Sequence, residues 1–380
     1  MKKISLILFA VMAVACSQAP QLTKSGINPD DFISERDGEP VALYTLSNSA
    51  GMEVCITNYG GRIVSWMAPD KDGGFKDIVF GFSKIDDYYI ENNDTNWGAA
   101  LGRYANRIDG GKLEIDGVEY QLVQNDNGLH CLHGGEIGWL HKVYSVEEYD
   151  STHLKLKMFS PDGDSGFPGN VTAYVTYTLK ENNALDIDYE ATTDAPTVIN
   201  MSNHSYFNLS GDPVNYSILE HELYVNADYY TPVNDVLIPA KMAEPVEGTP
   251  MDFRQMTLVG ARIGDDYEQL VAGNGYDHNW VIKREEGDGI IEVARMLCPK
   301  TGIQLSVWSY EPGLQVYSGN FLDGTIAGRY GAYPFRSAMC LETQHYPDSP
   351  HHQGEWPNVV LRPGETYKSF CEFKLDVVTE

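Results

Sequence analysis

Short runs of alternating apolar and polar residues fill the chain from about residue 40 onward, and they constrain the fold more than any other feature. The runs are rich in Val, Ile, Tyr and Thr and are separated by Gly, Asn and Asp, a pattern typical of antiparallel all-β proteins. Few segments show the period of an amphipathic helix. So many strands predict a large antiparallel β-sandwich, whose concave sheet has room for a cleft that binds a small molecule.

Three segments predict β-hairpins. In residues 112–122, Asp116-Gly117 supplies the positive φ angles of a type I′ turn between two alternating strands. Residues 170–193 and 290–310 repeat the pattern around polar turns. These local signals support the all-β assignment.

The first residues predict export. Lys2 and Lys3 form a basic region, and the apolar stretch 4–14 is too short to span a bilayer as a permanent helix. Residues 13–16 (AVAC) fit either a lipobox that leaves Cys16 lipidated or an A-x-A site cleaved just before Cys16. The polar stretch after this lone cysteine favours the lipobox, which resembles a bacterial lipoprotein leader. We therefore expect a periplasmic protein held to a bacterial membrane only through this anchor.

No linker rich in Pro, Ser or Gly interrupts residues 40–378, so a single folded domain is expected. The predicted organisation is a signal peptide at 1–15, a lipid-anchored tether at 16–38 and the β-sandwich domain at 39–380.

Composition excludes several classes of partner and site. Asp and Glu number 54 against 27 Lys and Arg, and the net charge of -27 repels nucleic acid. The cysteines after Cys16 are widely spaced, without a CxxC pair, and are expected to be buried thiols. Neither residues 130–133 (HCLH) nor His351-His352 has the second ligand pair of a zinc site, so no metal is expected.

The stretch 197–209 carries an unusual row of polar residues. If it is one strand, alternation places Asn200, Ser202, His204, Tyr206 and Asn208 on one face, opposite an apolar face. A polar face on a central strand predicts a polar ligand. Because His204 lies among these polar residues, a functional role is indicated more strongly for it than for an isolated histidine.

A second such place is residues 340–344 (CLETQ), where Glu342 and Gln344 lie two apart on one face. A strand carboxylate within an apolar segment would be costly without a partner. On these residues alone, a sheet-edge glutamate in water is the simpler interpretation.

Five segments, in this order and at these spacings, resemble the aldose 1-epimerase (galactose mutarotase) family. They are residues 102–108 (GRYANRI), 132–135 (LHGG), 203–209 (NHSYFNL), 275–279 (GYDHN) and 341–344 (LETQ), with further matches at 163–169, 313–324 and 361–364. The resemblance extends from about residue 40 to the C-terminus. It implies a galactose mutarotase-like supersandwich and an isomerase that interconverts the α and β anomers of free hexoses such as galactose or glucose.

Carried over residue by residue, the resemblance makes Glu342 the general base and His204 the general acid. The residues that would bind the sugar are Asn106, Arg107, His133, Asp277 and Gln315. Opening a hemiacetal needs one group to take the proton of the C1 hydroxyl and another to protonate the ring oxygen, so no cofactor is required. Neighbouring carboxylates such as Asp277 are expected to keep His204 protonated while Glu342 stays ionised.

Two other classes of function remain open at this stage. One is an exported carbohydrate-binding lipoprotein on the same scaffold without turnover, although binding alone does not require an acid and base pair. The other is a glycoside hydrolase or lyase, in which Glu342 and Asp277 would be the two carboxylates and His204 would have no role.

Overall fold

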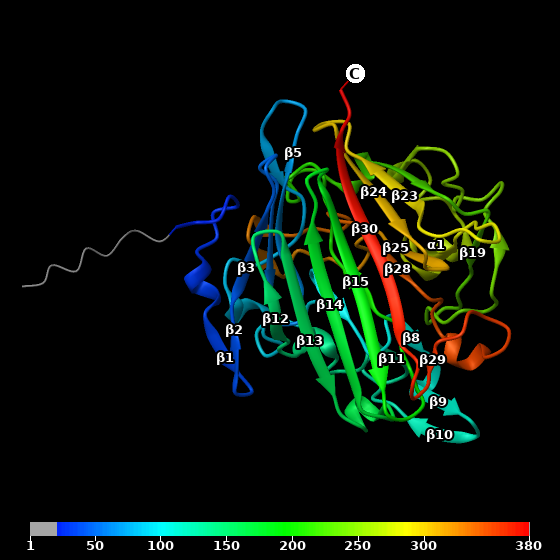
Figure 1. Ribbon diagram of the computed structural model, residues 1–380. Coiled ribbons are helices and arrows are strands. Elements are labelled where there is room, and N and C mark those ends of the chain that lie inside the picture. The colour runs from blue at the N-terminus through cyan, green and yellow to red at the C-terminus, as the bar shows by residue number, and fades with distance from the viewer. Residues whose placement is uncertain (1–20, 380) are drawn as a thin grey trace, which may run out of the picture.

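The computed structural model describes residues 21–379, whose regular secondary structure is almost entirely antiparallel β-sheet (Figure 1). One layer is a nine-stranded sheet with β30 near its middle. In spatial order its strands are β12 (Ser145–Tyr149), β13 (His153–Ser160), β14 (Val171–Leu179), β15 (Ala184–Thr193), β30 (Tyr367–Val377), β24 (Ile303–Ser309), β23 (Ile291–Leu297), β18 (Glu222–Val225) and β21 (Thr257–Leu258).

The opposing layer combines a five-stranded and a four-stranded sheet. The five-stranded sheet is β20 (Glu244–Pro245), β19 (Tyr229–Thr231), β22 (Asp277–Val281), β25 (Gly313–Tyr317) and β28 (Cys340–Gln344), and the four-stranded sheet is β3 (Leu43–Ser47), β4 (Glu53–Thr57), β5 (Arg62–Pro69) and β6 (Phe75–Asp77). The pair β7 (Ala99–Leu101) and β17 (Ser202–His204) lies between them. Gly98 joins this pair to Ile63 of β5, and the Ser202 hydroxyl donates to the Thr343 carbonyl of β28.

The remaining described elements are short. Two-stranded ladders are β1 (Ser34–Arg36) with β2 (Glu39–Val41), β8 (Arg107–Ile108) with β11 (Cys131–Leu132), β9 (Lys112–Ile115) with β10 (Val118–Gln121), β16 (Thr197–Val198) with β29 (Val360–Leu361), and β26 (Ala327–Gly328) with β27 (Gly331–Ala332). Within residues 21–379 there is one α-helix, α1 (Glu268–Ala272), and no helix there is long and apolar enough to cross a membrane. The predicted all-β sandwich is confirmed.

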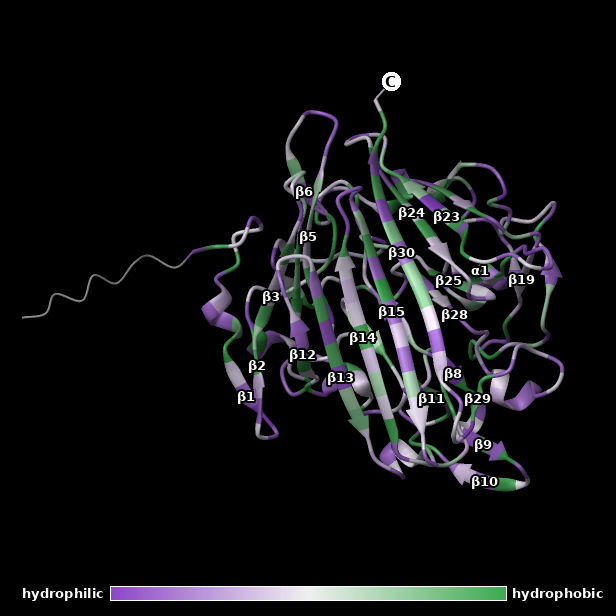
Figure 2. Ribbon diagram, in the orientation of Figure 1, coloured by the Kyte–Doolittle hydropathy of each residue, from purple (hydrophilic) through white to green (hydrophobic). Residues whose placement is uncertain are grey.

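Side-chain alternation explains how the nine-stranded sheet packs. Along β14, buried residues alternate with half-buried ones, and Figure 2 shows the resulting apolar and polar bands on the neighbouring strands. The inward face meets the second layer through Trp66, Phe207 and Phe373, whose ring centroids lie 5.2 to 6.2 Å apart. Aromatic side chains of this size contribute about 1.5–3 kcal/mol each when fully buried.

The three predicted hairpins are confirmed as β9–β10, β14–β15 and β23–β24. Asp116 and Gly117 have φ angles of 54° and 79°, as a type I′ turn requires. Turn chemistry is local, which is why the sequence predicted these elements well.

The prediction of one strand over residues 197–209 is wrong. Only β16 and β17 form within it, because the chain changes partner from β29 to β7 between them. Much of the predicted polar row binds backbone rather than a ligand: Asn200 donates to the Ala105 and His345 carbonyls, and Asn208 to the Tyr216 and Ser337 carbonyls.

Residues 21–38, part of the predicted tether, run along the sandwich and bury Ile27 and Phe32 against it. The predicted signal peptide and Cys16 lie outside the described residues.

Candidate active site

A cavity of about 190 Å³ brings the residues singled out in the sequence together. Its lining consists of Asn96, Asn106, Arg107, Leu132, His133, His204, Tyr206, Asp277, Gln315, Tyr317, Phe321 and Glu342. All seven residues predicted to act on or bind the sugar are among them. They come from segments more than 200 residues apart in the sequence, so only the fold unites them.

His204 and Glu342 face each other in this cavity. Nε2 of His204 lies 3.7 Å from Oε1 of Glu342, and both side chains are almost fully buried. At this separation the two atoms do not share a strong hydrogen bond, so each remains able to reach a different ligand oxygen. His204 is the last residue of β17, which lies beside β28, the strand that carries Glu342.

Three adjacent strands supply the acidic side of the cavity. Gln315 of β25 pairs in register with Glu342 of β28, and Asp277 begins the next strand, β22. The amide of Gln315 donates to Oδ1 of Asp277 across 2.7 Å. Gln315 and Tyr317, two residues apart on β25, both line the cavity.

The opposite side is built by the ladder between β8 and β11. Asn106 and His133 both have left-handed backbone, with φ of 66° and 52°, and the Asn106 N–H donates to Nδ1 of His133. Such conformations cost free energy outside Gly and are concentrated at functional sites. Arg107 donates from Nε to Asp126 over 2.7 Å, which fixes its guanidinium at the cavity wall.

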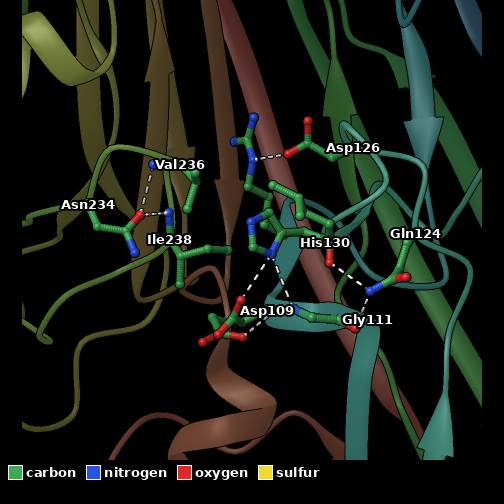
Figure 3. A network of polar contacts seen from close by, with 12 residues as sticks. Asp109, Gly111, Gln124, Asp126, His130, Asn234, Val236 and Ile238 are labelled. Atoms are coloured by element: carbon green, nitrogen blue, oxygen red, sulfur yellow. Dashed lines mark hydrogen bonds and ion pairs between the residues drawn. The ribbon is translucent and has the colours of Figure 1, made fainter.

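Figure 3 shows how the segment behind Arg107 is held. His130 lies 3.0 Å from Asp109, and Gln124 donates to the carbonyls of Gly110 and Leu129. Asp126, which belongs to this segment, faces the guanidinium of Arg107. Arg107 is therefore held in place before any ligand binds.

Burial dominates the electrostatics of the acid and base candidates. It raises the pKa of Glu342 well above the usual range, an effect that Asp277 reinforces and Arg107 opposes. Burial lowers the pKa of His204 to about 3 and that of His133 well below normal. The charge of Asp277 therefore acts on Glu342 rather than on His204, contrary to the expectation from the sequence.

Several cavity residues were not among the seven predicted to act on or bind the sugar, although Tyr206 belongs to the polar row predicted within residues 197–209. The ring of Tyr206 stacks on that of His204, with centroids 5.0 Å apart and planes at 15°. Phe321, 59% exposed, stacks on Tyr317 at the mouth, and Asn96 reaches in from a loop. An aromatic residue or amide on an irregular segment carries no periodicity, so the sequence held no signal for Phe321 or Asn96.

The described residues contain no group of three or more His, Cys, Asp or Glu placed to hold a metal ion. Cys55, Cys131, Cys298, Cys340 and Cys371 are all buried free thiols, which confirms that expectation.

Comparison with known proteins points to one family. The family model for aldose 1-epimerase matches residues 42–374. The chain is 36% identical to an aldose 1-epimerase of Escherichia coli K12, covering 89% of this chain and 96% of that one. It is 38% identical to a human galactose mutarotase, covering 86% and 92%.

Solved structures agree with this result. A homologue of aldose epimerase from C. elegans superimposes with a TM-score of 0.80 at 28% identity, covering 89% of this chain and all of that one. A galactose 1-epimerase from Lactobacillus acidophilus gives a TM-score of 0.77 at 29% identity, covering 91% and 97%. The predicted supersandwich fold is thereby confirmed.

Proposed function

The chain belongs to the aldose 1-epimerase family, and on that premise we propose that it interconverts the α and β anomers of free aldohexoses. The observation that carries the proposal is the pair of His204 and Glu342, with Nε2 and Oε1 3.7 Å apart inside a polar cavity. The two oxygens that exchange protons in a hemiacetal are bonded to the same carbon, so an acid and a base this close can serve both.

The reaction needs two proton transfers and no covalent intermediate. Glu342 takes the proton of the C1 hydroxyl while His204 protonates the ring oxygen, and the bond between C1 and the ring oxygen breaks. After rotation about the C1–C2 bond, the hydroxyl attacks the other face of the aldehyde with the two roles reversed. Each positioned transfer is worth about 10²- to 10⁴-fold.

The remaining cavity residues supply what a sugar requires. Arg107 donates, Asp277 accepts, and Asn106, His133 and Gln315 offer one or both. Fixed by their own hydrogen bonds to Asp126 and to each other, they can hold ring hydroxyls without reorganising.

Burial raises the pKa of Glu342 and lowers that of His204 to about 3, so it favours the uncharged form of each side chain. Catalysis uses the arrangement with a proton on His204 and an ionised Glu342, which sugar hydroxyls donating to Glu342 favour. The acid limb of the activity profile is therefore assigned to His204 and the alkaline limb to Glu342.

The competing functions explain less. A glycoside hydrolase would pair Glu342 with Asp277, yet Asp277 is bonded to Gln315 and His204 would have no part in the reaction. A protein that only binds sugar would not require a buried acid and base in contact distance.

Polarimetry tests the proposal. Purified protein added to freshly dissolved α-D-galactose or α-D-glucose is expected to speed the change in rotation far above the buffer blank. Sugar binding without any acceleration, with either sugar, would instead favour the exported carbohydrate-binding lipoprotein.

We also propose that the protein is exported and anchored through Cys16. Lys2, Lys3 and the apolar residues 4–14 support a leader, and the cysteine after residues 13–15 supports lipidation. An anchored enzyme there could prepare sugars released from polysaccharides for uptake.

Metabolic labelling with a radioactive fatty acid tests the anchor. The wild-type chain should carry label and remain with membranes, whereas Cys16→Ser should be unlabelled. An unlabelled wild-type chain released to the periplasm would show simple cleavage before Cys16.

A further inference from the structure

Gln344 is a fully buried polar side chain on the face of β28 that carries Glu342, and the reaction above does not use it. The two residues are two apart in the strand, so their side chains point the same way. Gln344 does not line the cavity. Neither its amide oxygen nor its nitrogen has a hydrogen-bond partner among the described residues. A buried amide in this state is costly, and such groups call for an explanation.

Asn279 of β22 reaches toward Gln344. Its Nδ2 donates to the Thr231 hydroxyl over 3.0 Å, which turns Oδ1 to the opposite side. There Oδ1 occupies the space that a Cβ at residue 313 would take, which explains why this position is Gly313. Gly313 is the register partner of Gln344, so the Asn279 oxygen lies beside the Gln344 position. Within residues 21–379 this oxygen also has no hydrogen-bond donor.

Glu342 presents the matching acceptor. Its Oε2 is buried and accepts no hydrogen bond from the described residues, while Oε1 faces His204. The charged or titratable groups that face it are His204 from β17, Asp277 from β22, Arg107 from β8, Tyr317 from β25, Tyr206 from the segment after β17 and the thiol of Cys340 on its own strand. A base that must ionise in this setting needs a donor on its far oxygen.

We propose that Gln344 is a positioning residue for Glu342, donating one amide proton to Oε2 of the ionised carboxylate and the other to Oδ1 of Asn279. The assignment rests on the proposed function, because it gives Gln344 a role within that acid and base pair. The amide favours the ionised form of Glu342. Asn279, held by Thr231, fixes the amide in the donating orientation.

Replacing Gln344 by Met keeps the length of the side chain and removes the donor. We expect Gln344→Met to lower kcat about 10-fold, the usual order for a hydrogen bond to a charged group. KM should be unchanged because Gln344 does not line the cavity. The alkaline limb of the kcat/KM profile should move to higher pH while the acid limb stays, since only the carboxylate loses a donor.

The matched control is Thr343→Val, on the opposite face of the same strand, which should move neither limb. A loss of rate in Gln344→Met without movement of the alkaline limb, or with a raised KM, would reduce Gln344 to a packing role. If that variant does not fold, Asn279→Ala must shift the same limb by a smaller amount, and an unmoved limb overturns the inference. Absence of mutarotation by the wild-type protein would defeat the proposed function instead.

Discussion

The nine-stranded sheet and the five-stranded sheet differ in what they bury. In β14 the burial alternates along the strand, and the polar residues take the half-buried positions. In β25 and β28 every position is buried, including Gln315, Glu342 and Gln344. Burying such groups costs free energy that folding does not require. The first sheet is therefore built for stability, and the second gives up stability to hold a reactive site.

The largest expected effect is on catalysis by the second sheet. Glu342→Gln should lower kcat/KM for α-D-galactose by about 10²- to 10⁴-fold, because the amide cannot take the C1 proton. Its free energy of unfolding should not fall, since the variant removes a buried ionisable group. Polarimetry measures kcat/KM, and urea unfolding measures the free energy of unfolding. A strongly destabilised variant would show that Glu342 stabilises the fold and would contradict the difference drawn between the two sheets.

The converse change lies in the first sheet. Leu156, fully buried on β13, packs in the main core. Leu156→Ala should lower the free energy of unfolding by about 2–5 kcal/mol while kcat remains that of the wild type below the melting range. The same urea and polarimetry measurements apply. A loss of kcat without a loss of stability would show that the nine-stranded sheet also determines the geometry of the site.

Asp277→Asn tests the electrostatic coupling inside the second sheet. Asp277 raises the pKa of Glu342, so the variant should move the alkaline limb of kcat/KM to lower pH. Loss of the carboxylate acceptor should also raise KM about tenfold. Measuring kcat/KM as a function of pH shows which limb moves. A shift of the acid limb instead would mean that Asp277 acts mainly on His204.

The last prediction concerns a buried histidine outside the site, where the effect at neutral pH is the smallest. Burial lowers the pKa of His221 to about 3, and its Nε2 accepts from the Leu209 N–H. The neutral ring stabilises the fold above the unfolded pKa of about 6.5, and that stability is lost as pH falls from there toward 3. His221→Gln should therefore reduce the slope of unfolding free energy against pH by about 1.4 kcal/mol per pH unit in that window. Urea unfolding at several pH values measures this slope, and an unchanged slope would show that burial does not lower the pKa of His221 in the folded state.

The sequence predicted most where the cause is local. The hairpin at Asp116-Gly117 follows from turn chemistry, and the alternation of β14 follows from one buried face. The strand over residues 197–209 was predicted wrongly because its partner changes from β29 to β7, which no local pattern encodes. The buried polar side chains of Asn200 and Asn208 likewise serve distant carbonyls.

The site was predictable mainly through the resemblance. Taken alone, Glu342 and Gln344 are equally well explained as solvent-exposed residues at a sheet edge. Arg107 belongs to no periodic pattern that would have indicated a site. What the sequence could not supply was the environment: Asp126 behind Arg107, the stacked ring of Tyr206, and the burial that raises the pKa of Glu342 and lowers that of His204. Those depend on contacts between segments far apart in the chain.

Exchange NMR at anomeric equilibrium tests the central claim most directly. With α- and β-D-galactose already equilibrated, a small amount of the wild-type protein should produce cross peaks between the two anomeric proton signals. Glu342→Gln and His204→Asn should reduce them to the level of buffer alone. Cross peaks of equal intensity with either variant, or none with the wild-type protein, would contradict the assignment of anomer interconversion to this pair.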